Sequence, residues 1–291
     1  MKYDIIIPTI FRDYPFLRKI IQYIYKNLDP DNIYIITSGK KSQYLPQIVR
    51  EKCIILDEDA LLKDLSIKRV YHLLYTYEKY HSRPGWYFQQ FLKMAFALTE
   101  FCKNEYYLSW DSDTLPLQHI DFFDTEGHPL FTMKSEYHQP YFNSIKRLLN
   151  IDEHNNKSYI AEHMLFNREI MKEVILKIEQ SAITGSDWIE KIINSIDKQE
   201  SCGFSEFETY GNFCATNYPN VYHERELATF RYGGYIQGRL ICDEILEALA
   251  FDLSIVTFEA YHKPPFPWGT LCNWYNWYIK KRERAIDKWG I

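Results

Sequence analysis

Short apolar runs alternate with amphipathic stretches over the first part of the chain. The runs at residues 4–9, 33–37 and 53–56 are rich in isoleucine, which is typical of strands buried in a parallel sheet. Between the first two runs, apolar residues recur at helical spacing, and Asp13 is placed to cap that helix. This order of strand, helix, strand, link and strand predicts a Rossmann-like N-terminal half.

The rest of the chain continues as a mixture of helices and strands. A break at Pro84 and Gly85 precedes an apolar helix that reaches about Leu98, and a short buried strand ends at Trp110. Further strands are predicted at 129–133, 159–166 and 254–258, and further helices at about 144–149, 170–178, 188–196 and 241–250. Together these elements predict an α/β fold with a mixed sheet flanked by helices, followed by a C-terminal aromatic and basic helix.

Composition narrows the class of protein. Of the 291 residues, 46% are hydrophobic and 25% are charged, which suits a globular protein with a sizeable core. The net charge of −5 argues against a general nucleic-acid binder, because such domains are usually basic. The six cysteines form no Cys-x-x-Cys pair, so we expect reduced thiols in a cytoplasmic protein, without a signal peptide or a membrane-spanning run.

The first half lacks the two commonest phosphate-binding motifs. Neither Gly-x-Gly-x-x-Gly nor a Walker sequence is present, which argues against dinucleotide oxidoreductases and P-loop enzymes. Thr9, Arg12 and Asp59 follow predicted strands, at the edge where open α/β sheets bind ligands. We predict that they contact a nucleotide donor. The alternative is that Arg12 is a solvated charge and Asp59 a loop residue.

Two carboxylates stand one residue apart directly after the strand that ends at Trp110. Residues two apart in an extended chain share a face, so Asp111 and Asp113 can face one ligand. Paired carboxylates without Cys or His nearby favour Mg²⁺ or Mn²⁺, which also take substrate phosphates. The same spacing recurs at residues 29 and 31 and at residues 57 and 59, so the position after a buried strand favours Asp111 and Asp113 as metal ligands.

Polar residues interrupt the apolar helix that follows Gly85. A buried lysine is costly unless it is paired with an anion, so Lys93, together with Gln90, is predicted to face donor phosphates or Asp111. The alternative is that Lys93 extends its side chain to the surface.

Two stretches that contain acidic residues stand out in the second half. Glu162 and His163 interrupt an apolar run, and Glu206 and Glu208 lie among aromatic residues. Burial by aromatics raises the pKa of a carboxylate, which suits a general base. The alternative for Glu208 is a helix N-terminus with Ser205 as its cap and Glu208 as the reciprocal partner, and both interpretations can hold together.

The end of the chain combines cations with aromatic residues. His262 follows the predicted strand 254–258 and precedes Lys263 and a proline-rich loop, so it can complete a metal site, although a lone histidine is more often structural. The tail from Trp274 to Trp289 mixes aromatic residues with lysine and arginine. Such a helix suits contact with a membrane surface, and packing on the domain is the alternative.

These parts, in this order, resemble glycosyltransferases of the GT-A fold. More specifically, they resemble a bacterial group that builds surface polysaccharides such as lipopolysaccharide or capsule. The resemblance covers most of residues 1–270 and rests on four motifs: Gly85-Trp86 with Gln89-Gln90 and Lys93, Trp110-Asp111-Ser112-Asp113, Glu162-His163-Met164, and Ser205-Glu206-Phe207-Glu208-Thr209-Tyr210-Gly211-Asn212.

The resemblance implies a fold, a cofactor and substrates. It implies one GT-A-like catalytic domain over 1–270, with a nucleotide-donor half at 1–133 and an acceptor half at 134–270, and a tail at 271–291. It also implies a nucleotide-sugar donor and a Mn²⁺ or Mg²⁺ ion held by the DxD residues Asp111 and Asp113 and by His262. Lys263 is then expected to contact the diphosphate, although an insertion of two prolines and a phenylalanine after it departs from the family pattern.

The same resemblance assigns roles to the acidic positions in the second half. Glu206 and Glu208 are the candidate bases if the reaction inverts configuration, and they position the acceptor if it retains configuration. Glu162, His163 and Tyr210 are the candidate contacts to a glycan or lipid-linked saccharide acceptor.

We therefore expect a hexosyltransferase-type enzyme, cytoplasmic or peripheral at the inner face of the membrane. The rival enzyme class is a nucleotidyl- or phosphotransferase, which would use the same carboxylates and metal. A non-catalytic carbohydrate- or lipid-binding protein is the alternative from another class.

Overall fold

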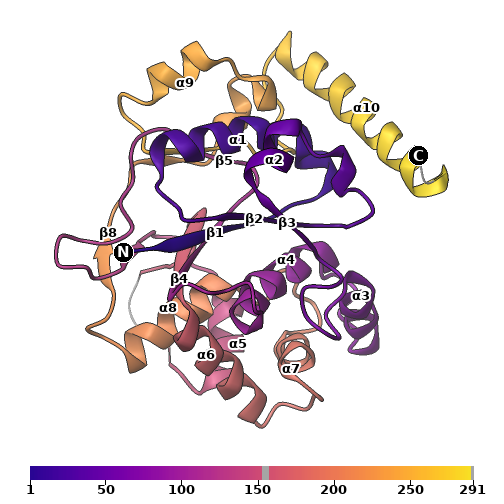
Figure 1. Cartoon of the computed structure of the whole chain (residues 1–291). Helices are drawn as coiled ribbons and strands as arrows, with labels where there is room; N and C mark the ends of the chain where they lie inside the picture. Colours follow the sequence, from indigo (N-terminus) through magenta and orange to yellow (C-terminus); the bar gives the residue numbers. More distant parts are fainter. Residues whose placement is uncertain (153–156, 290–291) are drawn as a thin grey trace. The chain divides into compact units, whose positions relative to one another are not determined.

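The computed structural model describes residues 1–152 and 157–289 (Figure 1). Five strands form the largest sheet in the order β3-β2-β1-β4-β7, where β1 is Tyr3–Pro8, β2 Ile33–Thr37, β3 Ile54–Asp57, β4 Tyr106–Trp110 and β7 His163–Asn167. β1 and β4 are parallel, with Tyr3 opposite Tyr106. β7 is antiparallel to β4, because Arg168, just after β7, donates its backbone N–H to the carbonyl of Glu105, just before β4. The sheet is therefore mixed, as predicted.

Two smaller sheets are built from the remaining strands. β10 (Ile255–Thr257) is antiparallel to β5 (Thr114–Pro116) and parallel to β9 (Thr229–Phe230). β6 (Leu130–Thr132) is parallel to β8 (His223–Arg225).

Ten α-helices account for most of the remaining regular structure in the described part of the chain. They are α1 (Tyr14–Asn27), α2 (Gln47–Lys52), α3 (Ile67–Thr76), α4 (Pro84–Ala95), α5 (Gln139–Leu149), α6 (Arg168–Gln180), α7 (Trp188–Ser195), α8 (Glu206–Asn217), α9 (Asp243–Leu249) and α10 (Trp268–Trp289). None of these helices combines the length and apolar character that crossing a bilayer requires.

The predicted α/β fold, a mixed sheet flanked by helices with a helix at the end of the chain, is confirmed. Most strand boundaries differ from the prediction by one residue, and one differs by four. The run predicted as a strand from residue 159 becomes a strand only at His163, because the backbone before it pairs with side chains instead of a neighbouring strand.

The chain divides into two compact units whose segments interleave along the sequence. We call the first the Glu206 unit; it comprises Met1–Ile6, Asp57–Ser109 and Phe122–Glu226. We call the second the Asp111 unit; it comprises Ile7–Leu56, Trp110–Asp121 and Leu227–Ile291. These units are not the predicted donor half (1–133) and acceptor half (134–270), because each of those halves is a continuous segment of the sequence. The two halves stay a prediction about function.

Each unit has a core built from the stripes that the sequence shows. In the Asp111 unit, α1 packs against β5. The apolar stripe of α1 is fully buried at Leu17, Ile20, Ile21 and Ile24. Each such side chain contributes about 1.5–3 kcal/mol to folding. In the Glu206 unit, α6 packs against α7 and α8, and aromatic rings fill the space around α8, with Phe131 stacked on Tyr222 at 3.9 Å.

Candidate functional site

A tight turn after β4 presents the two aspartates. Trp110 is fully buried, and its indole N–H donates to the carbonyl of Thr114 at 2.9 Å. Thr114 in turn donates its backbone N–H to the carbonyl of Asp111 at 3.2 Å. The turn is also tied to the end of β10, because the backbone N–H of Phe258 donates to the carbonyl of Asp113 at 2.7 Å. Asp111 and Asp113 are therefore half-buried in a turn that several hydrogen bonds hold in place.

Arg239 links two of the acidic side chains. Its guanidinium forms an ion pair with Asp13 and lies 3.7 Å from Oδ2 of Asp113, while its Nε donates to the carbonyl of Phe258 at 3.0 Å. Arg12 also approaches Asp13, with its Nε 3.4 Å from Oδ1, and the hydroxyl of Ser112 donates to Oδ2 at 3.3 Å.

The prediction that Asp13 caps the first helix is wrong. Asp13 occupies the residue before α1, but its side chain makes no capping hydrogen bond. The cationic partner Arg239 binds the carboxylate more strongly than a backbone N–H would, because both groups are charged and mostly buried.

The region around Asp113 carries more negative than positive charge. The pKa of Asp113 is raised to about 7, chiefly by burial; the carboxylates of Asp111, Asp13 and Glu259 also raise it, and Arg239 lowers it. A divalent cation would relieve this repulsion, and carboxylate oxygens are the ligands that Mg²⁺ and Mn²⁺ prefer. The residues present therefore fit a metal ion.

His262 lies in an aromatic surround in the same unit. It is 7% exposed, it stacks on Tyr235 with ring centroids 4.4 Å apart, and its Nδ1 has no hydrogen-bond partner in the described structure. Gly234 makes this packing possible, because a Cβ there would lie 2.7 Å from Cβ of His262. Within residues 1–152 and 157–289, His262 and the two aspartates do not bring three ligand atoms within 4.8 Å of one another, so holding one ion together would require local movement.

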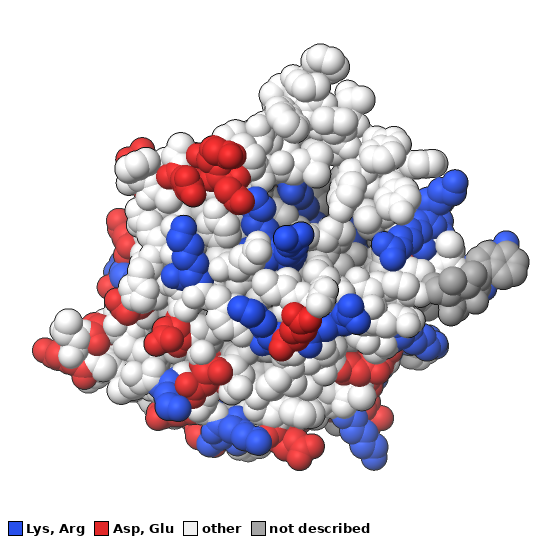
Figure 2. All heavy atoms as spheres, turned by 45° about the horizontal axis from the view of Figure 1, so that its top comes forward, with Lys and Arg blue, Asp and Glu red and all other residues white. Residues whose placement is uncertain are grey.

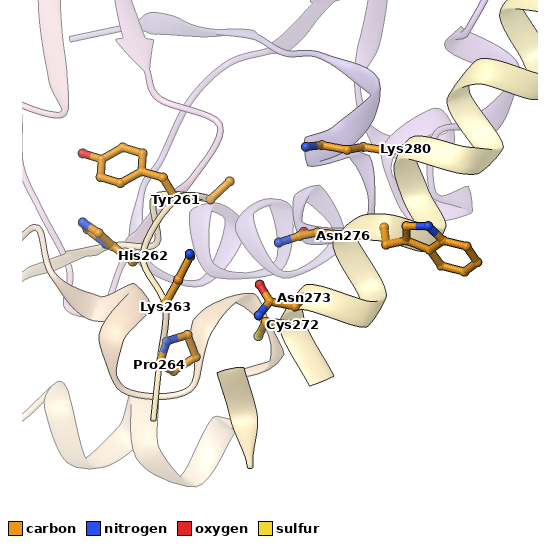
Figure 3. A pocket seen from close by; sticks show the side chains of 10 residues that line it. Tyr261, His262, Lys263, Pro264, Cys272, Asn273, Asn276 and Lys280 are labelled. Carbon is orange, nitrogen blue, oxygen red and sulfur yellow. The ribbon is translucent and has the colours of Figure 1, made fainter. Parts of the chain in front are cut away.

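A pocket with a volume of about 370 Å³ lies between the loop after β10 and helix α10. Its lining is Ala260, Tyr261, His262, Lys263, Pro264, Cys272, Asn273, Asn276, Trp277 and Lys280. Figure 3 shows Lys263 from the loop and Asn276 and Lys280 from α10 pointing into it. Two ammonium groups and an amide suit an anion such as a diphosphate.

The other predicted donor contacts lie at the ends of their strands. Thr9 is buried just after β1, and its backbone N–H donates to the carbonyl of Ile36 at 2.9 Å. Asp59 is exposed in a turn, where its backbone N–H donates to Oδ1 of Asp57 at 3.2 Å. Asp59 belongs to the Glu206 unit and its geometry fits the loop-residue alternative.

In the Glu206 unit, Lys93 is buried and paired. Its Nζ lies 2.9 Å from Oε1 of Glu206, with side chains only 4% and 6% exposed, and it also lies over the ring of Phe207 at 4.3 Å. Gln90 accepts the backbone N–H of Glu206 at 3.0 Å. The alternative in which Lys93 reaches the surface is wrong, because a carboxylate from α8 satisfies its charge inside.

Glu208 is held by three donors. The hydroxyl of Ser158 and the backbone N–H of Tyr159 bind one carboxylate oxygen at 2.9 and 3.1 Å, and the amide of Asn212 binds the other at 3.0 Å. Burial raises the pKa of Glu208 while these donors lower it. The predicted cap is confirmed at Ser205, whose hydroxyl accepts the backbone N–H of Glu208 at 3.2 Å. The reciprocal half of that capping box is wrong, because the Glu208 side chain turns to Ser158 instead.

The predicted acceptor contacts are also buried. Nε2 of His163 lies 3.0 Å from the hydroxyl of Thr132, and burial lowers the pKa of His163 well below 6.5. Tyr210 is fully buried, and its hydroxyl accepts the backbone N–H of Asn167 at 2.8 Å. Glu162, just before β7, is 1% exposed. In this structure these side chains line the core beside α8, and their proposed contact with an acceptor stays a prediction.

Sequence reasoning missed two sets of residues that the structure brings to the Asp111 unit. Arg239 follows Gly238 in a stretch without regular periodicity, so no local signal marks it as the partner of Asp13. Asn276 and Lys280 lie in the tail, and their i, i+4 spacing places them on one face of α10, which is a signal that could have linked them to Lys263.

Several solved structures resemble this chain. Mouse xyloside xylosyltransferase 1 has 13% identity, with 91% of this chain and 100% of that chain covered, and a TM-score of 0.49. The galactosyltransferase LgtC, solved with donor and acceptor sugar analogues, has 10% identity and a TM-score of 0.41. The match covers 96% of this chain and 95% of the LgtC chain. The bifunctional glycosyltransferase WbbM has 9% identity and a TM-score of 0.47. The match covers 94% of this chain and 51% of the WbbM chain.

Comparison with proteins of known sequence gives a family without an assigned activity. No curated protein matches the chain. Residues 9–231 match DUF6492, which is described as a family of unknown function. Because this match spans well over half of the sequence, the chain belongs to the DUF6492 family.

Proposed function

We propose that this protein is a metal-dependent glycosyltransferase that moves a sugar from a nucleotide-sugar donor to a glycan or glycolipid acceptor. The observation that carries the proposal is that one unit combines the Asp111–Asp113 turn with the Lys263–Lys280 pocket. The two are joined along the chain, because Phe258 is hydrogen-bonded to Asp113 and Lys263 follows five positions later. The sequence resemblance extends the proposal to bacterial surface-polysaccharide synthesis.

The chemistry of sugar transfer calls for this combination of groups. Breaking the bond between sugar and diphosphate leaves negative charge on the departing phosphate oxygens, which cations stabilise. Lys263, Lys280 and Asn276 would bind those oxygens. Asp111, Asp113 and His262 would hold Mn²⁺ or Mg²⁺, which supplies Lewis-acid stabilisation of the diphosphate when bound. Thr9 and Arg12, which belong to the same unit, remain our proposed contacts to the rest of the donor, and a role for Asp59 stays a prediction from the sequence.

The acceptor side of the proposal rests on the Glu206 unit. We propose Glu206 and Glu208 as the candidate bases of an inverting reaction, with Glu162, His163 and Tyr210 supporting the acceptor side. Lys93 binds the carboxylate of Glu206, and three donors bind that of Glu208, so each carboxylate is already oriented when an acceptor hydroxyl arrives.

A donor hydrolysis assay tests the reaction class. The full chain is incubated with a panel of nucleotide sugars, with and without Mn²⁺, and the released products are separated. Release of nucleoside diphosphate and free sugar supports a glycosyltransferase, while pyrophosphate release would assign the rival nucleotidyltransferase. Binding without any turnover, even with candidate acceptors present, would assign the carbohydrate-binding alternative.

Variants in the pocket test where the donor binds. Lys280→Ala should weaken nucleoside diphosphate binding about tenfold, because one charge-assisted contact is lost. Lys288→Ala, which removes an exposed lysine of α10 outside the pocket, is the matched control. Equal affinities of the two variants, measured by calorimetry, would place the donor elsewhere.

We also propose that α10 contacts the membrane surface. Ile279 and Ile286 face the body of the Asp111 unit at 4% and 9% exposure, whereas Trp274 and Trp277 are 63% and 57% exposed. The ammonium group of Lys281 lies over the ring of Trp277 at 5.2 Å. The end of the molecule that carries α9 and α10 in Figure 1 is turned forward in Figure 2, where Lys and Arg side chains gather in the middle and on one side.

Vesicle binding tests this contact. An exposed aromatic face beside lysines should bind vesicles that contain anionic lipid more tightly than neutral ones. Trp277→Ala should weaken binding at least several-fold, whereas Phe251→Ala, which removes an aromatic side chain that is 86% exposed and not part of α10, should not. Equal binding of the two variants would leave α10 as a packing element.

A further inference from the structure

Two imidazoles and a carboxylate, none of which has been given a role above, meet in the Glu206 unit. Nδ1 of His223 lies 2.7 Å from Oδ2 of Asp124, and Nδ1 of His128 lies 3.3 Å from the same oxygen. Ligand atoms of all three residues lie within 4.8 Å of one another. The two rings are stacked, with centroids 4.2 Å apart and planes 20° apart. The two Nδ1 atoms therefore face the same carboxylate oxygen.

The backbone holds the carboxylate in place. Oδ1 of Asp124 accepts the backbone N–H groups of Glu126 and His128 at 2.9 and 2.8 Å, which leaves Oδ2 for the imidazoles. The loop closes between the backbone N–H of Asp124 and the carbonyl of His128 at 2.9 Å, with Gly127 at a φ of +92°. Hydrogen bonds that orient a carboxylate in this way are typical support for a metal ligand.

The third ligand comes from a strand fixed against the same loop. His223 begins β8, which pairs with β6, and its backbone N–H donates to the carbonyl of Pro129 at 2.9 Å. His223 and the loop at Asp124–His128 are therefore held by separate backbone hydrogen bonds. A site assembled from two independently held segments changes little when an ion enters, which lowers the cost of binding.

We propose that Asp124, His128 and His223 form a binding site for a divalent transition-metal ion, Zn²⁺ by preference. Imidazole nitrogen favours Zn²⁺ over Mg²⁺ or Mn²⁺, and two histidines with one carboxylate leave a fourth position for water. Ligands of one tetrahedral zinc ion lie about 2.0–2.2 Å from it and hence roughly 3.4 Å from one another. The measured separations of 2.7 and 3.3 Å from Oδ2 to the two Nδ1 atoms are close to that value.

The ion would join two segments that are far apart in sequence. It would link the loop between Phe123 and Pro129, which are themselves paired by a β-bridge, to the start of β8. The site is independent of the proposed sugar transfer, because none of its residues belongs to the Asp111 unit. Failure of the donor assay would therefore leave this proposal standing, and its own failure would leave the donor assay unaffected.

Metal titration of the full chain tests the proposal. After dialysis against a chelator, Zn²⁺ and Mg²⁺ are titrated by calorimetry, and Co²⁺ is added as a spectroscopic probe. We expect one Zn²⁺ site that Mg²⁺ in excess does not displace, and visible Co²⁺ absorption bands that report nitrogen ligands. His223→Gln should weaken Zn²⁺ binding at least tenfold, and His128→Gln should do the same.

Two control variants make the result specific. His119→Gln alters an exposed histidine that pairs with Asp121 at 3.1 Å and lies outside the group of three ligands, so it should bind Zn²⁺ like the unaltered chain. Asp111→Asn should keep the Co²⁺ bands, since it alters the other proposed metal site. Absence of tight Zn²⁺ binding, or Zn²⁺ affinity unchanged in both His223→Gln and His128→Gln with their folding verified by circular dichroism, would overturn the proposal.

Discussion

Each unit contains an ion pair, and the two pairs differ in how deeply they are buried and in how far apart the charged groups lie. Glu206 and Lys93 are 2.9 Å apart with side chains 6% and 4% exposed. Asp113 and Arg239 are 3.7 Å apart with side chains 24% and 13% exposed, and Arg239 is shared with Asp13. Lys93 and Glu206 therefore form a buried pair of one cation and one anion, which we call the closed pair. Around Asp113 and Arg239, which we call the open pair, carboxylates outnumber the cations that contact them.

This difference indicates what each pair can do. Separating Lys93 from Glu206 would leave a buried charge without compensation, so the pair is fixed and holds α8 against α4. Around Asp113 another cation can enter without displacing a buried partner, and the surplus negative charge favours it. Of these two pairs, the one at Asp113 can therefore take up a further cation, whereas the one at Glu206 is a fixed structural contact.

The largest effect should follow from opening the closed pair. Lys93→Met leaves Glu206 buried without its cation and should lower the free energy of unfolding by about 3–5 kcal/mol. Urea denaturation measures this. Lys172→Met is the matched control, because Lys172 is exposed and pairs with Glu169 at 3.0 Å on the surface of α6. It should cost less than about 1 kcal/mol.

A double variant sharpens the same point. Lys93→Met combined with Glu206→Gln removes both charges, so it should recover part of the stability lost in the single variant. Equal losses for Lys93→Met and Lys172→Met would contradict the view that the Glu206 pair is a closed structural contact.

A substitution at Asp113 should lower the activity and leave the stability nearly unchanged. Asp113→Asn should reduce metal-dependent release of nucleoside diphosphate about 10²–10³-fold, or about 3–4 kcal/mol in the barrier. Its free energy of unfolding should change little, because one member of a crowded carboxylate group is neutralised. Asp121→Asn, which alters an exposed aspartate beside His119, is the control. An unchanged rate in Asp113→Asn would remove this residue from the donor site.

The two sites were predictable from sequence to different degrees. The turn at Asp111 and Asp113 could be placed because a buried strand precedes it, whereas the apolar helix around Lys93 left open whether that lysine is paired inside or reaches the surface. The partners could not be found in this way. Arg239 reaches Asp13 across 226 residues, and Gln90 reaches Glu206 across 116, so no local periodicity connects them. The capping role predicted for Asp13 failed for the same reason, since the competing partner lies far along the chain.

Glu208 provides an intermediate case. Glu208→Gln replaces an oxygen acceptor with an amide that cannot satisfy the hydroxyl of Ser158, the N–H of Tyr159 and the amide of Asn212 together. The free energy of unfolding should fall by about 2 kcal/mol. Donor hydrolysis by the folded variant should persist at a rate within several-fold of the unaltered chain. Loss of activity with unchanged stability would instead make Glu208 the base and Glu206 the structural residue.

The smallest effect tests whether the core around His163 is dry. Burial keeps His163 neutral by lowering its pKa well below 6.5, while the unfolded chain binds a proton near that pH. Stability is therefore fully present above that pH and should fall by about 1 kcal/mol between pH 6.5 and 5.5. His163→Gln should remove this part of the pH dependence, whereas His119→Gln, which alters an exposed histidine, should retain it. Urea denaturation at the two pH values measures both. Parallel pH profiles for the two variants would mean that His163 takes up a proton in the folded protein, and hence that water reaches the core around His163.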